Sequence, residues 1–238
     1  MDKMKKLKKI NSLLIEHFGV PKRAKRLPNP VDLLIATILS QNTNDQNSYK
    51  AFKNLKDNYK NWKDVAKLTK SKLLKLIKIA GLGEQKSDAI KGFLNEQLSE
   101  RGKINLNYLK KMTDDNVISE LSAYKGIGLK TSACVLLFSM DRNVCPVDTH
   151  VHRTLNRIGV VKTKSPDKTF FEIQNFIPEK SAHSLHTNLI RLGREICKPL
   201  NPKCVICPLI KICNYEDKNL MPVATKNSNK DFMLLDSV

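Results

Sequence analysis

Apolar residues recur along most of this chain at the three- to four-residue spacing that places them on one face of an α-helix. Near the beginning such a face runs from Ile10 to Phe18, and the residues after Asn29-Pro30 carry a broader apolar stripe, typical of a buried helix over 31–40. The same pattern predicts further helices over residues 46–55, 71–79, 84–98, 114–123, 129–140, 149–158, 167–177 and 181–196. No alternating stretch of useful length indicates a β-strand. The chain is therefore predicted to be all-α.

Neither end of the chain carries the pattern of a targeting or membrane segment. The N-terminal apolar stretch is interrupted by Asn11, Glu16 and His17, unlike a secretory signal. No apolar run approaches the ~18 residues that a membrane span needs. Residues 217–238 are polar and aperiodic, so we expect a mobile tail there. These features predict a cytoplasmic protein with no membrane partner.

The charge of the 238 residues is strongly unbalanced. Forty-two lysines and arginines stand against 23 acidic residues, which leaves a net charge of +19. A basic chain of this size usually binds a polyanion, and nucleic acid is the first candidate. Lysine outnumbers arginine 34 to 8, however, and a lysine-rich proteome from an AT-rich genome accounts for much of the excess equally well. Charge alone therefore does not establish a nucleic-acid partner.

Two similar glycine hairpins stand before helical segments. Gly81-Leu82-Gly83 and Gly126-Ile127-Gly128 each place one apolar residue between two glycines, with a lysine in the first turn of the helix that follows. Such a turn leaves backbone N–H groups free at a helix N-terminus, where a phosphate can bind. Glu84 would repel a phosphate at the first hairpin, so we assign phosphate binding to Gly126–Gly128. The alternative is that both are plain helix-to-helix turns.

Two residues near the second hairpin are suited to chemistry. Lys130 lies in the first turn of its helix, where the positive end of the helix dipole and burial both favour the neutral, nucleophilic amine. Asp148 precedes the predicted helix 149–158, so it can cap that helix and still stabilise a sugar oxocarbenium ion with its charge. The alternatives are a solvated Lys130 and an Asp148 that only caps.

Four of the six cysteines are clustered in the pattern Cys197-x6-Cys204-x2-Cys207-x5-Cys213, with three prolines between them. In a reducing cytoplasm such a cluster indicates metal ligands rather than disulfides. Four thiolates at these short spacings suit a compact loop around a metal centre. Both Zn²⁺ and a [4Fe–4S] cluster accept four cysteines, so the spacing alone leaves the metal open.

Three motifs in this order together resemble the endonuclease III family of DNA repair enzymes. They are Tyr124-Lys125-Gly126-Ile127-Gly128-Leu129-Lys130-Thr131, then Val147-Asp148-Thr149-His150-Val151-His152-Arg153, then the four-cysteine loop. Leu39-Ser40-Gln41-Asn42-Thr43 is an additional match, and the resemblance covers about residues 10–215. The hairpin and the aspartate are weak signals individually. The cysteine spacing is a strong one, and the combination is very specific.

The resemblance implies a helix-hairpin-helix glycosylase fold with DNA in a cleft between two domains. A six-helix barrel over 30–141 would be inserted into an iron–sulfur cluster domain made of 1–29 and 142–216. Lys130 matches the family's Schiff-base nucleophile and Asp148 its catalytic carboxylate, facing each other across the domain junction. Gln41 matches a residue that fills the gap left by the extruded nucleotide, and Leu82 matches an apolar wedge on the opposite strand.

The activity that the resemblance implies is that of a bifunctional DNA glycosylase and AP lyase. Such an enzyme removes oxidised pyrimidines from double-stranded DNA, acts on abasic sites, and cleaves the strand 3′ to the lesion by β-elimination. The family usually carries a [4Fe–4S] cluster, here on Cys197, Cys204, Cys207 and Cys213. We expect a monomer that works at the nucleoid of a prokaryotic cytoplasm.

This sequence departs from the family pattern at the hairpin, and other functions stay open. Tyr124-Lys125 replaces the usual Leu-Pro, and Leu129 replaces a frequent arginine, which removes a possible phosphate contact. A mismatch-specific thymine or adenine glycosylase is similar but typically has Tyr or Ser at the position of Lys130. An 8-oxoguanine glycosylase lacks the cysteine loop. A non-catalytic DNA-binding iron–sulfur protein would not need both Lys130 and Asp148.

Overall fold

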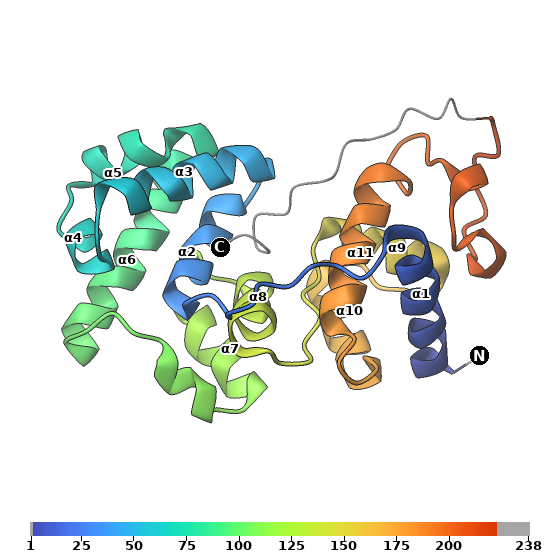
Figure 1. The fold of residues 1–238 in the computed structure, drawn as a ribbon, viewed down its shortest axis with the longest axis horizontal. Coiled ribbons are helices and arrows are strands. Elements are labelled where there is room, and N and C mark those ends of the chain that lie inside the picture. The colour runs from blue at the N-terminus through green and yellow to red at the C-terminus, as the bar shows by residue number, and fades with distance from the viewer. Residues whose placement is uncertain (1, 223–238) are drawn as a thin grey trace. The chain divides into compact units, whose positions relative to one another are not determined.

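The computed structural model describes residues 2–222, and within this part of the chain all regular structure is helical, as predicted. Most of the tail that we expected to be mobile, residues 223–238, lies outside the described residues. The described residues form two compact units (Figure 1). We call them the central unit, Ala24–Asp141, and the terminal unit, residues 2–23 with 142–222. None of the described helices is long and apolar enough to cross a membrane.

The central unit consists of seven α-helices joined by short connections. They are α2 (Pro30–Ser40), α3 (Asp45–Asn58), α4 (Trp62–Ala66), α5 (Lys70–Ile77), α6 (Gly83–Arg101), α7 (Asp114–Ser122) and α8 (Leu129–Met140), with the 3₁₀ turns η1 (Lys78–Ala80) and η2 (Asn107–Lys111). Side-chain caps define most of the helix starts. At α2, for example, Pro30 occupies the first helical position and the Asn29 side chain accepts a hydrogen bond from the Val31 N–H.

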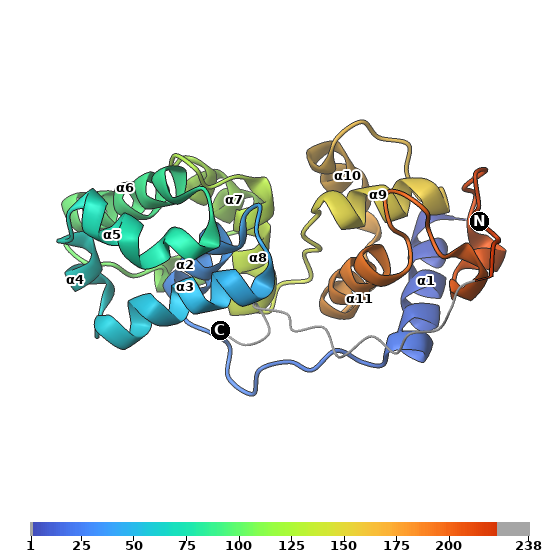
Figure 2. The same cartoon turned by 90° about the horizontal axis from the view of Figure 1, so that it is seen from above.

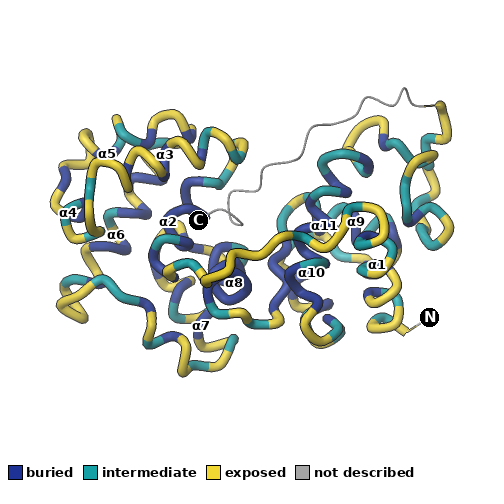
Figure 3. The backbone as a smooth tube through the Cα atoms, in the orientation of Figure 1, coloured by how far each residue is buried: buried dark blue, intermediate teal, exposed yellow. Residues whose placement is uncertain are grey.

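The core of the central unit surrounds α2 and α8, which pack against each other. Both are buried along most of their length: every residue from Pro30 to Leu39 except Asp32 is buried, as is every residue from Thr131 to Ser139. This is the pattern of a helix enclosed by others rather than of one with a wet face. Figure 3 shows the difference between these dark-blue helices and the yellow outer surface of the unit. The two central helices therefore give the loops at their ends a rigid base.

The terminal unit brings the beginning of the chain against its C-terminal half. Its helices are α1 (Lys3–Phe18), α9 (Thr149–Ile158), α10 (Pro166–Ile173) and α11 (Ala182–Glu195), followed by the 3₁₀ turns η4 (Cys204–Ile206) and η5 (Ile210–Ile212). α11 packs against both α1 and α9 (Figure 2). Arg191 and Asn188 of α11 donate hydrogen bonds to the carbonyls of Phe18 and Gly19, which fixes the end of α1.

The predicted helices agree with the structure except at α1, which begins at Lys3 rather than at Ile10, and where a segment is short. The predictions for 129–140 and 149–158 coincide with α8 and α9, whereas α4 and η2 were not predicted. The predicted segment 71–79 divides into α5 and η1, and 167–177 divides into α10 and the 3₁₀ turn η3 (Gln174–Phe176). A five-residue helix has too few positions to show a helical period, and the last turn of a helix often tightens to 3₁₀ geometry.

Candidate active site and cysteine centre

The hairpin at residues 126–128 is anchored by apolar residues and exposes its glycines. Tyr124 is 6% exposed, with its ring edge-on to Phe93 and its hydroxyl accepting a hydrogen bond of 2.8 Å from the Gln97 amide. Ile127 is also buried, and its N–H donates to the Tyr124 carbonyl at 3.1 Å. Tyr124, which departs from the family pattern, therefore serves as a core anchor for the turn.

The two glycines of this hairpin are needed for different reasons. Gly126 has a φ of +85°, and a Cβ built on it would lie 2.7 Å from the Cβ of Ala89, so the chain itself demands glycine there. Gly128 has an ordinary φ of −103°, and a Cβ would meet nothing within 4 Å. Gly128 occupies the N-cap position just before α8 and provides no side-chain cap. The backbone at Gly128 is therefore bare toward the outside, as a phosphate site requires.

Lys130 stands in the first turn of α8, directly after this bare backbone. Its side chain is half-buried, and among residues 2–222 it has no hydrogen bond or ion pair. Gln41, which ends α2, donates through Nε2 to the Gly126 carbonyl at 3.3 Å and to the Thr131 hydroxyl at 3.4 Å. The structure thus joins Gln41, the hairpin and the helix of Lys130 within the central unit.

Leu82 protrudes from the other hairpin in a strained conformation. It is 44% exposed, and its φ of 49° places it in the left-handed region, which costs a leucine about 1–2 kcal/mol. An exposed, strained apolar residue that the core does not hold is typical of a functional contact. Glu84 beside it forms an ion pair with Lys70 at 2.8 Å. The repulsion of a phosphate that the sequence assigns to Glu84 is therefore partly offset.

Asp148 belongs to the terminal unit and caps α9, as predicted. Its Oδ1 accepts a hydrogen bond of 2.8 Å from the Val151 N–H, and no other hydrogen bond to this carboxylate is present in the described part of the chain. The preceding segment is fixed, because Gln174 exchanges two hydrogen bonds of 3.0 Å with the Cys145 backbone. The His186 ring also contacts the Pro146 carbonyl at 2.8 Å. Asp148 is thus held in place with most of its acceptor capacity unused.

The four clustered cysteines line one small cavity together with residues of α9 and α11. Its other walls are mainly apolar and include Ile158, Leu192, Ile196, Pro202 and Leu209. Burial raises the pKa of the Cys207 thiol to about 12 and also raises that of Cys213. A cationic centre would be needed to keep thiolates in this cavity. Within residues 2–222, no three Cys, His, Asp or Glu side chains are arranged to hold a metal ion.

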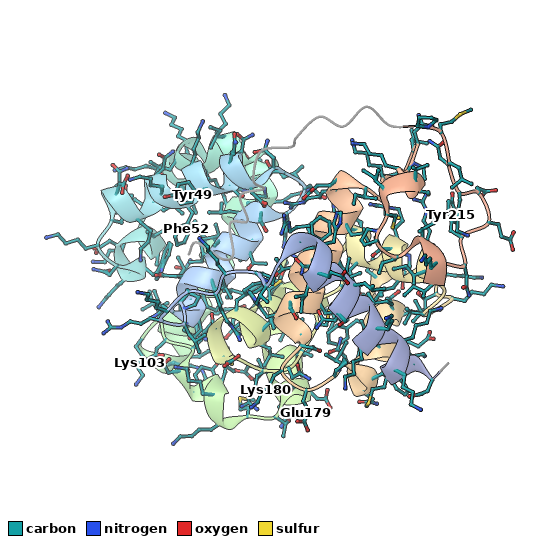
Figure 4. All side chains as sticks on the ribbon, turned by 45° about the vertical axis from the view of Figure 1, so that its right-hand side comes forward. Tyr49, Phe52, Lys103, Glu179, Lys180 and Tyr215 are labelled. Atoms are coloured by element: carbon teal, nitrogen blue, oxygen red, sulfur yellow. The ribbon has the colours of Figure 1, made fainter. Side chains whose placement is uncertain are left out.

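Two arginines of α9 hold the cysteine loop, and the sequence did not single out either role. The Arg153 Nε donates to the Cys197 carbonyl at 3.0 Å. The Arg157 Nη1 lies 3.6 Å from the Cys197 Sγ and donates to the Lys198 carbonyl at 2.6 Å. The Arg157 guanidinium also stacks on the ring of Tyr215, which Figure 4 labels. The i, i+4 spacing of the arginines on one helix face was the available signal.

Similarity to known proteins decides the family. A model of the HhH-GPD superfamily of base excision DNA repair proteins matches residues 35–179. Endonuclease III of Thermotoga maritima is 35% identical over 187 residues, which are 79% of this chain and 84% of that protein. The chain belongs to the endonuclease III family. A protein of Arabidopsis thaliana whose name reads "putative DNA glycosylase" is 36% identical over 188 residues, which are 79% of this chain and 64% of that protein.

Solved structures of an endonuclease III and of a thymine-DNA glycosylase have the same fold. A non-covalent endonuclease III–DNA complex superposes with a TM-score of 0.74 and 25% identity, covering 90% of this chain and 96% of that one. A thermostable thymine-DNA glycosylase reaches a TM-score of 0.72 at 22% identity, covering 89% of this chain and 96% of that one. The second likeness establishes the fold alone. The predicted helix-hairpin-helix glycosylase fold is confirmed.

Proposed function

We propose that this endonuclease III homologue is a bifunctional DNA glycosylase and AP lyase that uses Lys130 as its nucleophile. The observation that carries the proposal is the environment of the Lys130 side chain. It is half-buried and has no hydrogen bond or ion pair in the described chain, and it follows directly on Leu129 at the bare N-terminus of α8. The Lys130 amine is therefore not engaged in a structural hydrogen bond or ion pair within this part of the chain, and it lies next to backbone that can bind a phosphate. A homologue with Tyr or Ser at this position could not form an imine with the sugar.

The reaction begins with extrusion of the damaged nucleotide from the duplex, which costs a few kcal/mol. The Lys130 Nζ attacks C1′ while the C1′–N bond to the base breaks and its electrons leave with the base. The Asp148 carboxylate stabilises the positive charge that develops on the sugar. The departing base takes up a proton, and the C1′–O4′ bond then opens with transfer of an amine proton to O4′, which leaves a protonated imine between Nζ and C1′. The imine acidifies the C2′–H. Water takes that proton, its electrons form a C2′–C3′ double bond, and the C3′–O bond breaks so that the 3′ phosphate leaves by β-elimination.

Duplex DNA is the proposed partner, held mainly through its phosphates. The uncapped amides at the start of α8 would bind one phosphate near the lesion. Leu82 would enter the stack on the opposite strand and Gln41 would fill the space of the extruded nucleotide. The net charge of +19 adds attraction that does not depend on sequence. We further propose that the protein is a monomer that works at the nucleoid. The prokaryotic source stays a prediction, because one of the relatives is from Arabidopsis thaliana.

The hairpin predicts opposite effects of two glycine substitutions. In Gly128→Asp, the new carboxylate can cap α8, so we expect no loss of melting temperature. The same carboxylate would repel a phosphate, so we expect the affinity for any duplex to fall about tenfold or more, alike for all sequences. Fluorescence anisotropy with undamaged duplexes measures this. Gly126→Ala should instead lower the free energy of unfolding by about 1–2 kcal/mol or more. Equal affinity of Gly128→Asp and wild type would contradict the phosphate site.

Oxidised or ring-saturated pyrimidines are the proposed substrates. The resemblance to the endonuclease III family supports this choice, and Lys130 favours it over the mismatch-specific glycosylases of the same superfamily. The test is a panel of duplexes with one lesion each, in which we expect base release coupled to strand cleavage at oxidised pyrimidines. Release of thymine or adenine from mismatches without strand cleavage would favour the alternative.

A [4Fe–4S] cluster on Cys197, Cys204, Cys207 and Cys213 is the proposed occupant of the cysteine cavity. All four line that cavity, and Arg157 offers an N–H to the sulfur of Cys197. In a cubane each thiolate binds a different iron, so the sulfurs need not converge on one point as around Zn²⁺. The cluster would stabilise the loop and take no part in the lyase chemistry.

The cluster proposal predicts a yellow-brown protein with about four irons per chain. Cys204→Ala should lose the iron and most of the folding yield, because the loop has few buried apolar residues of its own. Cys134→Ala removes a buried cysteine of α8 outside the cavity, so it should retain the iron. Metal analysis with absorption spectroscopy measures both. Stoichiometric zinc in a colourless, active protein would rule out the iron–sulfur centre.

A further inference from the structure

Lys86, near the start of α6, has a buried ammonium group whose hydrogen-bond partners are both backbone carbonyls. Its side chain is 1% exposed, and its Nζ donates to the Leu39 carbonyl at 2.8 Å and to the Ala80 carbonyl at 2.7 Å. No carboxylate pairs with it among residues 2–222. Burial lowers the pKa of Lys86 to about 8, so it is still mostly protonated at neutral pH. Burying a charge in this way is expensive, and a methionine would fill the space at less cost.

Both carbonyls lie at helix ends that lead into the segments proposed to enter DNA. Leu39 is in the last turn of α2, two residues before Gln41. Ala80 is the last residue of η1, two residues before Leu82. Carbonyls at helix C-termini lack intrahelical donors and attract a cation. One ammonium therefore caps two helix ends and ties the two segments together.

We call the two hydrogen bonds of Lys86 the Lys86 clamp. The Gln41 side chain extends this series of contacts to the hairpin before Lys130. The Gln41 side chain donates to the Gly126 carbonyl and to the Thr131 hydroxyl. A continuous series of contacts thus joins the Leu82 turn to the N-terminus of α8 within the central unit. The strained left-handed conformations of Leu82 and of Asn42, with φ values of 49° and 50°, lie next to the clamped positions. Local strain of this kind persists only where the surroundings fix it.

We propose that Lys86 is a positioning residue that holds the Leu82 turn and the Gln41 segment in one fixed arrangement, so that both enter the base stack together. The proposal rests on the proposed function of these two segments. A lysine that only stabilised the core would affect all substrates alike. A clamp on the extruding residues matters for a lesion that is still paired and stacked, and much less for a site that is already exposed.

The test compares Lys86→Met with Lys91→Met, which provides a matched control on the same helix. Lys91 also donates to two carbonyls, those of Ala66 and Leu68, but at the end of α4. In single-turnover assays we expect Lys86→Met to act about tenfold or more slowly on a paired lesion, since small misplacements have large effects. Its rate at an abasic site opposite a gap should stay within about twofold of wild type. Lys91→Met should show no such difference between substrates.

Amide hydrogen exchange tests the clamp without any activity. In Lys86→Met, exchange should accelerate at residues 41–43 and 81–83 and stay unchanged at 129–133. In the wild-type protein the two segments should open with the same free energy, because one group holds both. The proposal would be overturned if the two segments opened with different free energies in the wild-type protein. It would also be overturned if Lys86→Met slowed the reactions on the paired lesion and on the exposed abasic site equally. If Lys86→Met does not fold, hydrogen exchange of the wild-type protein still tests whether the two segments open together. If the wild-type protein incises neither substrate, the proposed function is refuted, whereas the clamp is still tested by hydrogen exchange.

Discussion

Replacing Lys130 with glutamine is expected to abolish strand cleavage and covalent trapping by borohydride on lesion-containing duplexes. Glutamine has no nucleophilic amine, so no imine can form and the C2′–H is not acidified. Loss of a covalent nucleophile lowers rates by at least about 10⁴-fold. Binding should change little, because the amides at the start of α8 belong to the backbone and remain in place. Gel assays of trapping and incision, with anisotropy for binding, measure the three quantities.

Lys103→Gln is the matched control for this experiment. Lys103 is an exposed lysine of the central unit, labelled in Figure 4, and its replacement removes the same single charge. We expect wild-type trapping and incision. A Lys130→Gln variant that still formed the adduct would refute Lys130 as the nucleophile, and equal losses in both variants would point to charge alone.

The Asp148→Asn substitution is expected to slow base release by about 10²–10³-fold, because the carboxylate charge acts where the oxocarbenium ion forms. Asparagine caps helices about as well as aspartate, and its amide oxygen can still accept from the Val151 N–H. The melting temperature should therefore stay near that of wild type. Single-turnover base release and thermal unfolding separate the two roles.

Asp167→Asn is the control for Asp148→Asn. Asp167 is an exposed carboxylate in the first turn of α10, in the same unit. Its replacement should leave base release unchanged. If Asp148→Asn released bases at the wild-type rate but melted much earlier, Asp148 would be a helix cap and nothing more.

The parts of the fold that the sequence predicts are those with local signals. The ends of α9 follow from Asp148, which caps its start, and Gly159, which has a φ of +79° just after its end. α4 has no such signal, because Val65 and Ala66 are its only buried residues and five positions show no period. Its position is set by packing against α6 instead.

The candidate site divides in the same way. The cysteine spacing and the two hairpins are visible in the sequence, whereas the contacts of Lys86 join positions 47 residues apart and could not be read from it. The ion pair of Glu84 with Lys70 could not be read from the sequence either, because it exists only after folding. What was missed is tertiary contact, which no local pattern encodes.

The most direct test of the central claim is to reduce the enzyme–DNA adduct with borohydride on an oxidised-pyrimidine duplex, digest it, and locate the modified lysine by mass spectrometry. We predict a single adduct, on the Nζ of Lys130. An adduct on any other lysine, or base release with no adduct at all, would contradict it.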